Sequence, residues 1–389
     1  MKALQGLKIL DMSRLLPGPY CSMMLADFGA DVIKVEDPQL GDYCRDFEPQ
    51  IHGTSMWHLL LNRGKRSLTI DLRQPSGKEL FLQLVQQADV VMEGYRPGVL
   101  DKLGVGYSAA SKLNPRIIYC SITGYGKIGP YIYDAGHDLN YVSLAGITAM
   151  SGEKDGKPAI PGVLTSDMSA GMQAAIAILI ALRHRDQSGE GQEIDISLHN
   201  TALSLLPTAA SCLFGDSSIA ARGTHWFTGS QPNYNIYQTA DNRYMAIGCL
   251  ENKFWYNMCA AMQRLDLVDN IKQERLFEST IQELQREFAT KTAAEWMQIF
   301  QGKDTCVTHV LSYAEAAQDP HCLANEMVLE IDDAKYGKHR QIGFPIKLSK
   351  TPAAIERHAP ERGEHSEQVL LENGFSIEQI SKLKELRII

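Results

Sequence analysis

Short apolar runs alternate with amphipathic segments along the first half of the chain. Residues 7–10 form an apolar run, residues 20–28 have a helical pattern that ends at Gly29, and residues 31–36 form a second apolar run. This order predicts a strand, a helix and a strand, which is the repeating unit of a parallel sheet. No GxGxxG sequence follows the first strand, so the pattern gives no support for a dinucleotide site.

The rest of the pattern divides the chain into four parts. We expect residues 1–207 to form the first part of a large Rossmann-like α/β domain, and residues 208–231, which are small and polar, to form a crossover linker. Residues 232–325 predict a smaller α+β domain, because two alternating segments around 240–242 precede mostly helical sequence. Residues 326–389 form a tail.

The stretch from Ile117 to Arg185 contains the longest apolar helix that the pattern predicts. This helix is apolar almost all round, which predicts that it is buried. Ser166 or Asp167 is a natural N-cap, because a short side-chain oxygen can accept a free backbone N–H there. Asp167 is therefore either a helix cap or a carboxylate kept ionised in a pocket.

Composition restricts the class of protein. The chain has 389 residues, 44% of them hydrophobic, and a formal net charge of −8, which argues against a nucleic-acid partner. The N-terminal sequence lacks the apolar region of a signal peptide, and we expect no apolar run long enough to span a membrane. Eight cysteines without a CxxC pair indicate a reduced, cytoplasmic protein without a structural zinc site.

Four cations stand next to predicted strands. Arg63, Lys65 and Arg66 precede the strand expected at 67–72, and Arg96 directly follows the strand expected at 89–94. Ligands of open α/β sheets bind at the carboxyl ends of strands, and arginine and lysine are common phosphate ligands. These cations could hold the phosphates of a cofactor, although a solvated basic turn and a surface arginine explain the same residues.

Several longer motifs resemble the class III CoA-transferase (CaiB/BaiF) family, which includes the α-methylacyl-CoA racemases. They are NRGKRSLTIDL, ADVVMEGYRPGVLDKLGVGY, ITGYGKIGP, GHDLNY and SGEGQEIDISL. Four further stretches are most similar to the racemase branch: AGHDLNYVSLAG, PNYNIYQTADNRYMAIGCLE, KTAAEWMQIFQGKDTCVTHVL and GEHSEQVLLENGFS.

The resemblance implies a particular architecture. The N-terminal half and the tail would together form the large Rossmann-like domain, with the smaller domain inserted between them. Two subunits would be threaded through one another as an interlocked homodimer. The active site would lie where the large domain of one subunit meets the small domain of the other.

The resemblance also implies roles for individual residues. His137 of the GHD motif and Asp167 would flank the α-carbon of an acyl-CoA substrate, and Glu251 would support the site by pairing with the histidine. Coenzyme A would enter as part of the substrate, with no tightly bound cofactor and no metal, and would be held by a set of predicted contacts: Arg63, Lys65, Arg66, Arg96, Asp138 and Tyr141. From the residues alone, His137 could equally be a turn histidine and Glu251 a helix cap.

The residues that the resemblance selects suit the removal and return of a proton beside a thioester. Two acid/base groups, His137 and Asp167, can work from opposite faces of the α-carbon, and the N–H groups that begin the Asp167 helix could stabilise the enolate. The first hypothesis is therefore a 2-methylacyl-CoA racemase or epimerase.

Two other functions fit the same residues. In a CoA-transferase, Asp167 would attack the donor thioester and pass through an acyl-aspartyl anhydride. The transferase branch often carries a glycine-rich loop, and the comparable stretch here, FTGSQPNY, has one glycine, which weakens this hypothesis. The third possibility is an acyl-CoA-binding protein without catalytic activity.

Overall fold

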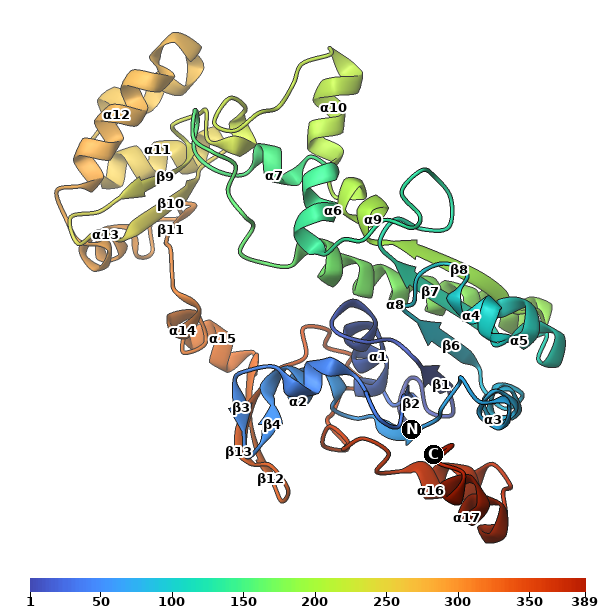
Figure 1. Ribbon diagram of the computed structural model, residues 1–389. Helices are drawn as coiled ribbons and strands as arrows, with labels where there is room; N and C mark the ends of the chain where they lie inside the picture. Colours follow the sequence, from blue (N-terminus) through green and yellow to red (C-terminus); the bar gives the residue numbers. More distant parts are fainter. The chain divides into compact units, whose positions relative to one another are not determined.

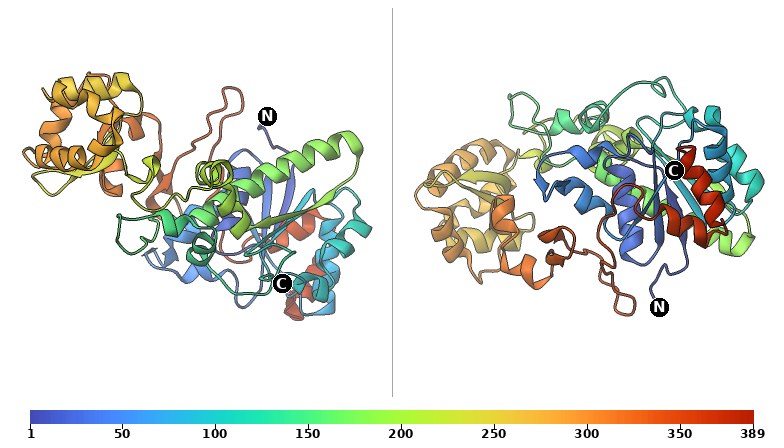
Figure 2. Two further views of the ribbon diagram at one scale, coloured as in Figure 1. Left: turned by 90° about the horizontal axis from the view of Figure 1, so that it is seen from above. Right: turned by 60° about the horizontal axis from the view of Figure 1, so that its bottom comes forward.

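The computed structural model describes residues 1–389, which divide into two compact units (Figures 1 and 2). The first unit contains Met1–Ala145, Val163–Leu205 and Leu323–Ile389, and the second contains Gly146–Gly162 and Leu206–Cys322. Residues 146–162 were predicted to lie in the large domain, because nothing in their sequence marks them as part of the second unit. The C-terminal tail belongs to the first unit.

A six-stranded sheet forms the centre of the first unit, and every neighbouring pair of strands is parallel. The strand order is β5-β2-β1-β6-β7-β8. The strands are β1 (Lys8–Asp11), β2 (Asp31–Glu36), β5 (Arg66–Thr69), β6 (Val90–Glu93), β7 (Ile118–Thr123) and β8 (Gln192–Ser197). The prediction of a parallel α/β fold is therefore confirmed.

Helices cover both faces of this sheet, and each face has its own apolar core. One core includes side chains of α3 (Pro75–Val85), α5 (Tyr107–Leu113), α16 (Ser366–Glu372) and α17 (Ile377–Glu385). The other includes side chains of α1 (Pro17–Asp27), α6 (Asp138–Leu144), α8 (Thr165–Ser188) and α9 (Leu198–Ser204). Burial of these two sets of apolar side chains is the main driving force that holds the strands in place.

The strand order reverses between β1 and β6. From β1 the chain adds β2 and β5 on one side, and from β6 it adds β7 and β8 on the other. The segments that leave β1 and β6 at their carboxyl ends therefore diverge, and such a point in an open α/β sheet is where ligands bind. In the first unit this crevice begins at Asp11 and Glu93.

Helix α8 is buried on one side only. Its small residues face α1, where a Cβ added to Gly171 would lie 2.7 Å from the carbonyl oxygen of Pro17. Four of its large apolar side chains are instead exposed on the single chain: Met172, Ile176, Leu179 and Ile180. The prediction of burial all round is therefore wrong for one chain, because apolar composition does not tell which side of a helix is covered.

The same helix bears on the expectation about membrane spans. By length and composition, α8 is long and apolar enough to cross a membrane, and half of its apolar window is buried inside the protein. The expectation that no apolar run reaches this length was therefore wrong. Core helices of globular proteins pass the same test, so the helix is weak evidence for a span.

The second unit has an antiparallel sheet of β9 (Tyr234–Gln238), β10 (Tyr244–Gly248) and β11 (Val307–His309), with β10 in the middle. Its core includes α11 (Asn252–Ala261), α12 (Phe277–Phe288) and α13 (Ala293–Phe300). The predicted hairpin around 240–242 is confirmed, since β9 and β10 pair directly.

The segment predicted as a polar crossover, residues 208–231, is more ordered than its composition suggested. It contains most of helix α10 (Pro207–Gly215), which begins with a proline at its first position, and the short helix η2 (Trp226–Thr228). The remaining elements are η1 (Tyr43–Asp46), β3 (Gln50–Ile51), β4 (Thr54–Ser55), α2 (Met56–Asn62), α4 (Val99–Leu103), α7 (Ile147–Met150), η3 (Leu265–Lys272), η4 (Glu274–Leu276), α14 (Tyr313–Ala316), α15 (Pro320–Ala324), β12 (Val328–Asp333) and β13 (Gly337–Ile342).

Candidate active site

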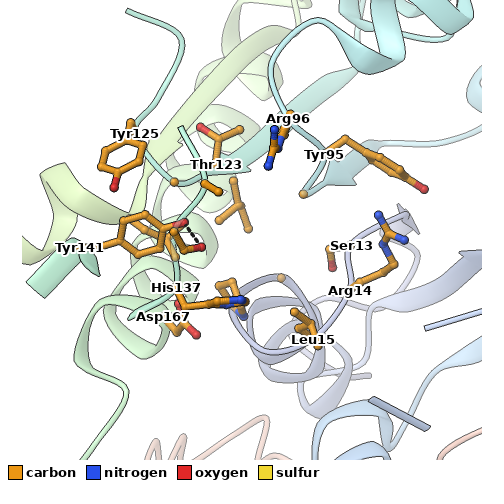
Figure 3. Close-up of a pocket in the computed structure, with 18 of the residues that line it drawn as sticks. Ser13, Arg14, Leu15, Tyr95, Arg96, Thr123, Tyr125, His137, Tyr141 and Asp167 are labelled. Atoms are coloured by element: carbon orange, nitrogen blue, oxygen red, sulfur yellow. Dashed lines mark hydrogen bonds between the residues drawn. The ribbon is translucent and has the colours of Figure 1, made fainter. Parts of the chain in front are cut away.

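A pocket of about 370 Å³ lies at the carboxyl ends of β1, β6 and β7, where the strand order reverses. Its lining residues all belong to the first unit. Figure 3 shows His137 and Asp167 at one end of this pocket and Arg14 and Tyr95 at the other. The labelled lining side chains are Ser13, Arg14, Leu15, Tyr95, Arg96, Thr123, Tyr125, His137, Tyr141 and Asp167.

The loop after β1 forms one wall of the pocket, and buried charged side chains hold it in place. Lys34 donates a hydrogen bond to the carbonyl oxygen of Ser13 (3.1 Å) and pairs with Asp42 (2.8 Å), which also accepts from the backbone N–H of Leu15 (3.2 Å). Burial raises the pKa of Asp42, but Lys34 outweighs it and holds that pKa below its usual range. Leu15 has a φ of 65°, a conformation that costs free energy and is kept only where its surroundings impose it.

The loop after β6 forms the next wall. The backbone N–H of Tyr95 donates to the buried carboxylate of Glu93 (2.7 Å), which fixes the turn that carries Arg96. The guanidinium of Arg14 lies over the ring of Tyr95, 4.8 Å from its centroid, and 6.0 Å from that of Tyr43. Neither Arg14 nor Arg96 takes part in an ion pair, so both cations are available to an anionic ligand.

His137 directly precedes the first residue of helix α6. It is exposed, occupies the N-cap position, and its backbone N–H donates to the side-chain oxygen of Asn140 (3.0 Å). Tyr141, one turn further on, donates its hydroxyl to the carbonyl oxygen of Gly136 (2.6 Å), and burial raises the pKa of this phenol to about 12. Because a Cβ at Gly124 would lie 2.6 Å from the Tyr141 hydroxyl, that position has room only for glycine.

Asp167 is the third residue of α8 and is half-buried in the pocket wall. Burial, and secondarily the negative charge of Asp138, raise the pKa of this carboxyl to about 7. Asp138 is buried and accepts hydrogen bonds from the backbone N–H groups of Ser166 (2.7 Å) and Asp167 (3.1 Å). Asp167 can therefore either hold or release a proton near neutral pH.

These contacts correct two predictions about the start of α8. Neither Ser166 nor Asp167 caps the helix: its N-cap position is Leu164, without a side-chain cap, and the carboxylate of Asp138 from α6 satisfies the free N–H groups instead. The N–H groups of Ser166 and Asp167 are therefore occupied and cannot stabilise an enolate oxygen. The sequence could not show this, because the capping residue is 28 positions from Ser166.

The predicted basic cluster also has a different role in the structure. Arg63 is buried and pairs with Asp27 (2.8 Å), and Arg66 pairs with Asp31 and with Glu372 (each 2.6 Å). Lys65 is fully buried, where it contacts Asp11 (3.4 Å) and donates to a side-chain oxygen of Asn62 (2.9 Å) and the carbonyl oxygen of Pro19 (3.0 Å). The cluster is absent from the pocket lining. We therefore do not retain these three residues as phosphate contacts.

Glu251 belongs to the second unit, so its pairing with His137 stays a prediction. It occupies the N-cap position of α11, but its side chain makes no capping hydrogen bond. The alternative that Glu251 is a helix cap therefore has no support from the local geometry. Its carboxylate is exposed.

Sequence reasoning missed Arg14. It lies three residues after the end of β1, as Arg96 lies three residues after the end of β6, so the rule that selected Arg96 could have found it. No group of three or more His, Cys, Asp or Glu side chains in the protein is arranged to hold a metal ion.

The parallel sheet and the pocket where its strand order reverses, lined by His137, Asp167 and two arginines without ion-pair partners, define an α/β protein with a candidate ligand site. Sequence comparison identifies the family. Residues 4–366 match CoA-transferase family III, and the chain belongs to that family.

The relatives divide between two activities. The human alpha-methylacyl-CoA racemase is 33% identical over the whole of this chain and 97% of its own length. The mouse succinyl-CoA:glutarate CoA-transferase is also 33% identical, over 96% of this chain and 86% of its own length. A crystal structure of a CAIB/BAIF family protein from Brucella suis is 31% identical and has a TM-score of 0.80, with 96% of this chain and 99% of that chain covered. Identity alone does not separate the two activities.

Proposed function

We propose that the protein is a 2-methylacyl-CoA racemase or epimerase that moves a proton at the carbon next to the thioester. The observation that carries this proposal is that His137 and Asp167 line one pocket and that Asp167 has a pKa of about 7. An acid/base group is most effective when its pKa is near the working pH. A general structural or binding role for Asp167 does not require such a value.

In the proposed reaction His137 and Asp167 share one proton. The group without the proton takes the α-hydrogen from one face and leaves an enolate, and the other group returns a proton to the opposite face. The roles are then exchanged, and the same pair works in the reverse direction. Activity requires one proton on the pair, so the rate should follow a bell-shaped pH profile.

Arg14 and Arg96 are the proposed contacts for the phosphates of coenzyme A. Both line the pocket and neither is paired within the protein, and guanidinium groups bind phosphate through charge-assisted hydrogen bonds. In Figure 3 Arg14 lies at the end of the pocket away from Asp167. This arrangement would place the nucleotide end of an acyl-CoA near Arg14 and its thioester near the acid/base pair.

A homodimer remains part of the proposal. The exposed apolar stripe of α8 (Met172, Ile176, Leu179 and Ile180) is a surface that a second subunit could cover. In such a dimer Glu251 of one subunit could approach His137 of the other. Sedimentation velocity on the purified protein tests this point, and a monomer at micromolar concentration would contradict it.

The decisive experiment is proton exchange in D₂O. A single enantiomer of a 2-methylacyl-CoA is incubated with the enzyme, and the α-hydrogen is followed by NMR together with the configuration. We expect loss of the α-proton signal with racemisation, and we expect the His137→Ala and Asp167→Asn variants each to lose at least about 10²-fold in rate. A wild-type enzyme that exchanges no α-proton over several acyl chains would contradict the proposal.

The alternative is a CoA-transferase in which Asp167 is the nucleophile. Relatives with transferase activity are as similar as the racemases, which is the observation that favours it. The test offers free carboxylates as acceptors and treats the reaction with hydroxylamine. An Asp167 hydroxamate together with retained transfer in His137→Ala would establish the transferase and exclude the racemase as the main activity.

A further inference from the structure

Asp138 connects the two elements that carry the proposed acid/base pair. It is the first residue of α6, directly after His137, and only 5% of it is exposed. One of its carboxylate oxygens accepts from the N–H groups of both Ser166 and Asp167 in the first turn of α8. His137 directly precedes Asp138, and Asp167 is one of the two residues that Asp138 contacts. Asp138 therefore adjoins both proposed catalytic groups.

Helix α8 depends on this contact because it has no cap of its own. Its N-cap residue is Leu164, which offers no side-chain acceptor. Ser166 is fully buried, so its N–H could not find water if Asp138 were removed. A buried donor without a partner is costly, and a carboxylate at a helix N-terminus also interacts favourably with the helix dipole.

The charge of Asp138 adds an electrostatic effect to the geometric one. After burial, it is the second cause of the raised pKa of Asp167. The other titratable side chains that line the pocket are Arg14, Tyr43, Tyr95, Arg96, Tyr125, Asp134, His137 and Tyr141. From the helices packed against α8, the pocket lining includes Pro17 and Gly18 of α1 and Leu198 of α9, which carry no charge.

We infer that Asp138 is a positioning residue, whose carboxylate clamps the first turn of α8 to the first turn of α6 and so fixes Asp167 relative to His137. This inference rests on the proposed proton-transfer function and replaces the earlier prediction that Asp138 contacts coenzyme A. Asp138 acts through Asp167 and does not touch the reacting atoms. Its two effects, position and charge, can be separated by substitution.

Asp138→Asn separates them, because an amide oxygen can still accept both N–H groups but carries no charge. We expect this variant to fold and to exchange the α-proton, with one limb of its pH–rate profile moved to lower pH and neither limb moved to higher pH. Asp138→Ala removes the acceptor as well. We expect it to lose about 10²-fold in kcat, the size of effect that misplacing a catalytic group produces, with KM changed less than about threefold.

Asp186→Asn is the matched control, because Asp186 is exposed near the far end of α8 and its substitution removes the same charge from the helix that carries Asp167. Its pH–rate profile should coincide with that of the wild type. If Asp138→Ala does not fold, Asp138→Glu takes its place. Glutamate keeps the charge but displaces the oxygen, so its kcat should fall while the limb that moves in Asp138→Asn stays near its wild-type position.

A substrate-free measurement separates this inference from the proposed function. The ¹³C resonance of the Asp167 carboxyl is titrated in wild type and in Asp138→Asn, and we expect a lower midpoint in the variant. A wild type without α-proton exchange would end the proposed function while leaving this titration as the test of the charge of Asp138. Superimposable titrations in the two proteins would overturn the electrostatic effect of Asp138, and a loss in Asp138→Ala that lies in KM with kcat unchanged would overturn its positioning role.

Discussion

The charged side chains beneath the pocket and those that line it belong to the same crevice, but the first set is paired with opposite charges and the second is not. Below the pocket, Lys34 pairs with Asp42, Lys65 contacts Asp11, and all four side chains are fully buried. In the pocket, Arg14 and Arg96 have no ion-pair partner, and Asp167 meets another carboxylate instead of a cation.

The difference follows from what each set must do. A buried charge is tolerated only when a partner and hydrogen bonds compensate for lost hydration, so the lower set holds the loop after β1 in one conformation. A charge that binds a ligand must remain unpaired within the protein until the ligand binds. The buried set should therefore control stability, and the pocket set should control binding and proton transfer.

The largest effect is expected from breaking a buried pair. Arg63→Ala leaves Asp27 buried without its cation and also removes hydrogen bonds to Gln341 and to the carbonyl oxygen of Ile342. Loss of one partner from such a pair costs about 3–5 kcal/mol of unfolding free energy. Urea denaturation followed by circular dichroism measures it.

Arg96→Ala is the matched control for this prediction, since the same residue type is removed from an exposed and unpaired position. Its unfolding free energy should stay within about 0.5 kcal/mol of the wild type. Equal destabilisation by the two substitutions would show that the division into structural and ligand-binding cations is wrong.

Asp167→Asn should raise stability at alkaline pH. The pKa of Asp167 is about 7 in the folded protein, above the value near 4 of an unfolded chain, so the folded state binds more protons between these values. Wild-type stability therefore falls as the pH rises from about 4 to 7, and the loss persists above that window. The variant lacks this loss and should be more stable by about 2–4 kcal/mol at pH 8.5.

The advantage of Asp167→Asn should shrink steadily toward pH 4.5, where the wild-type carboxyl is protonated in the folded protein. Denaturation curves at several pH values for both proteins give the comparison. A constant difference across the range would mean that Asp167 is not the group that titrates. The buried carboxylate of Asp42 cannot give this signature, because Lys34 holds its pKa below the usual range.

How much of the fold and of the candidate site could be predicted depends on whether the sequence signal lies in neighbouring residues. Alternating apolar runs identified β1, α1 and β2 and the hairpin of β9 and β10, because strands and helices have different periods that are visible in a few residues. The resemblance selected His137 and Asp167, which the structure brings to one pocket.

Several failures were contacts between distant positions. Asp27 and Asp31 lie 36 and 35 residues from the arginines that they pair with, so the residues around the predicted phosphate-binding cluster at 63–66 do not show that these cations are already paired. The cap of α8 comes from another helix for the same reason. Burial of only one side of α8 is also decided by what α1 covers, which composition does not contain.

Arg14→Ala and Arg96→Ala should weaken the binding of coenzyme A by about tenfold to a hundredfold each, the effect of a lost hydrogen bond between charged groups. Isothermal titration calorimetry with coenzyme A measures this, and added salt should reduce the difference. An acyl-pantetheine, which lacks the nucleotide phosphates, is the control ligand and should bind the variants as it binds the wild type. Equal losses for both ligands would place the arginines elsewhere on the substrate.

The smallest effect is expected from Tyr43, whose ring lies 6.0 Å from the guanidinium of Arg14. A cation–π contact at an exposed site contributes about 0.5–1 kcal/mol, so Tyr43→Leu should weaken coenzyme A binding about two- to fivefold by letting Arg14 move. Tyr43→Phe keeps the ring and should bind as the wild type does. The substitution should have no further effect in an Arg14→Ala background, because the ring acts only through that arginine. An additive loss in the double variant would instead mean that Tyr43 contacts the ligand itself.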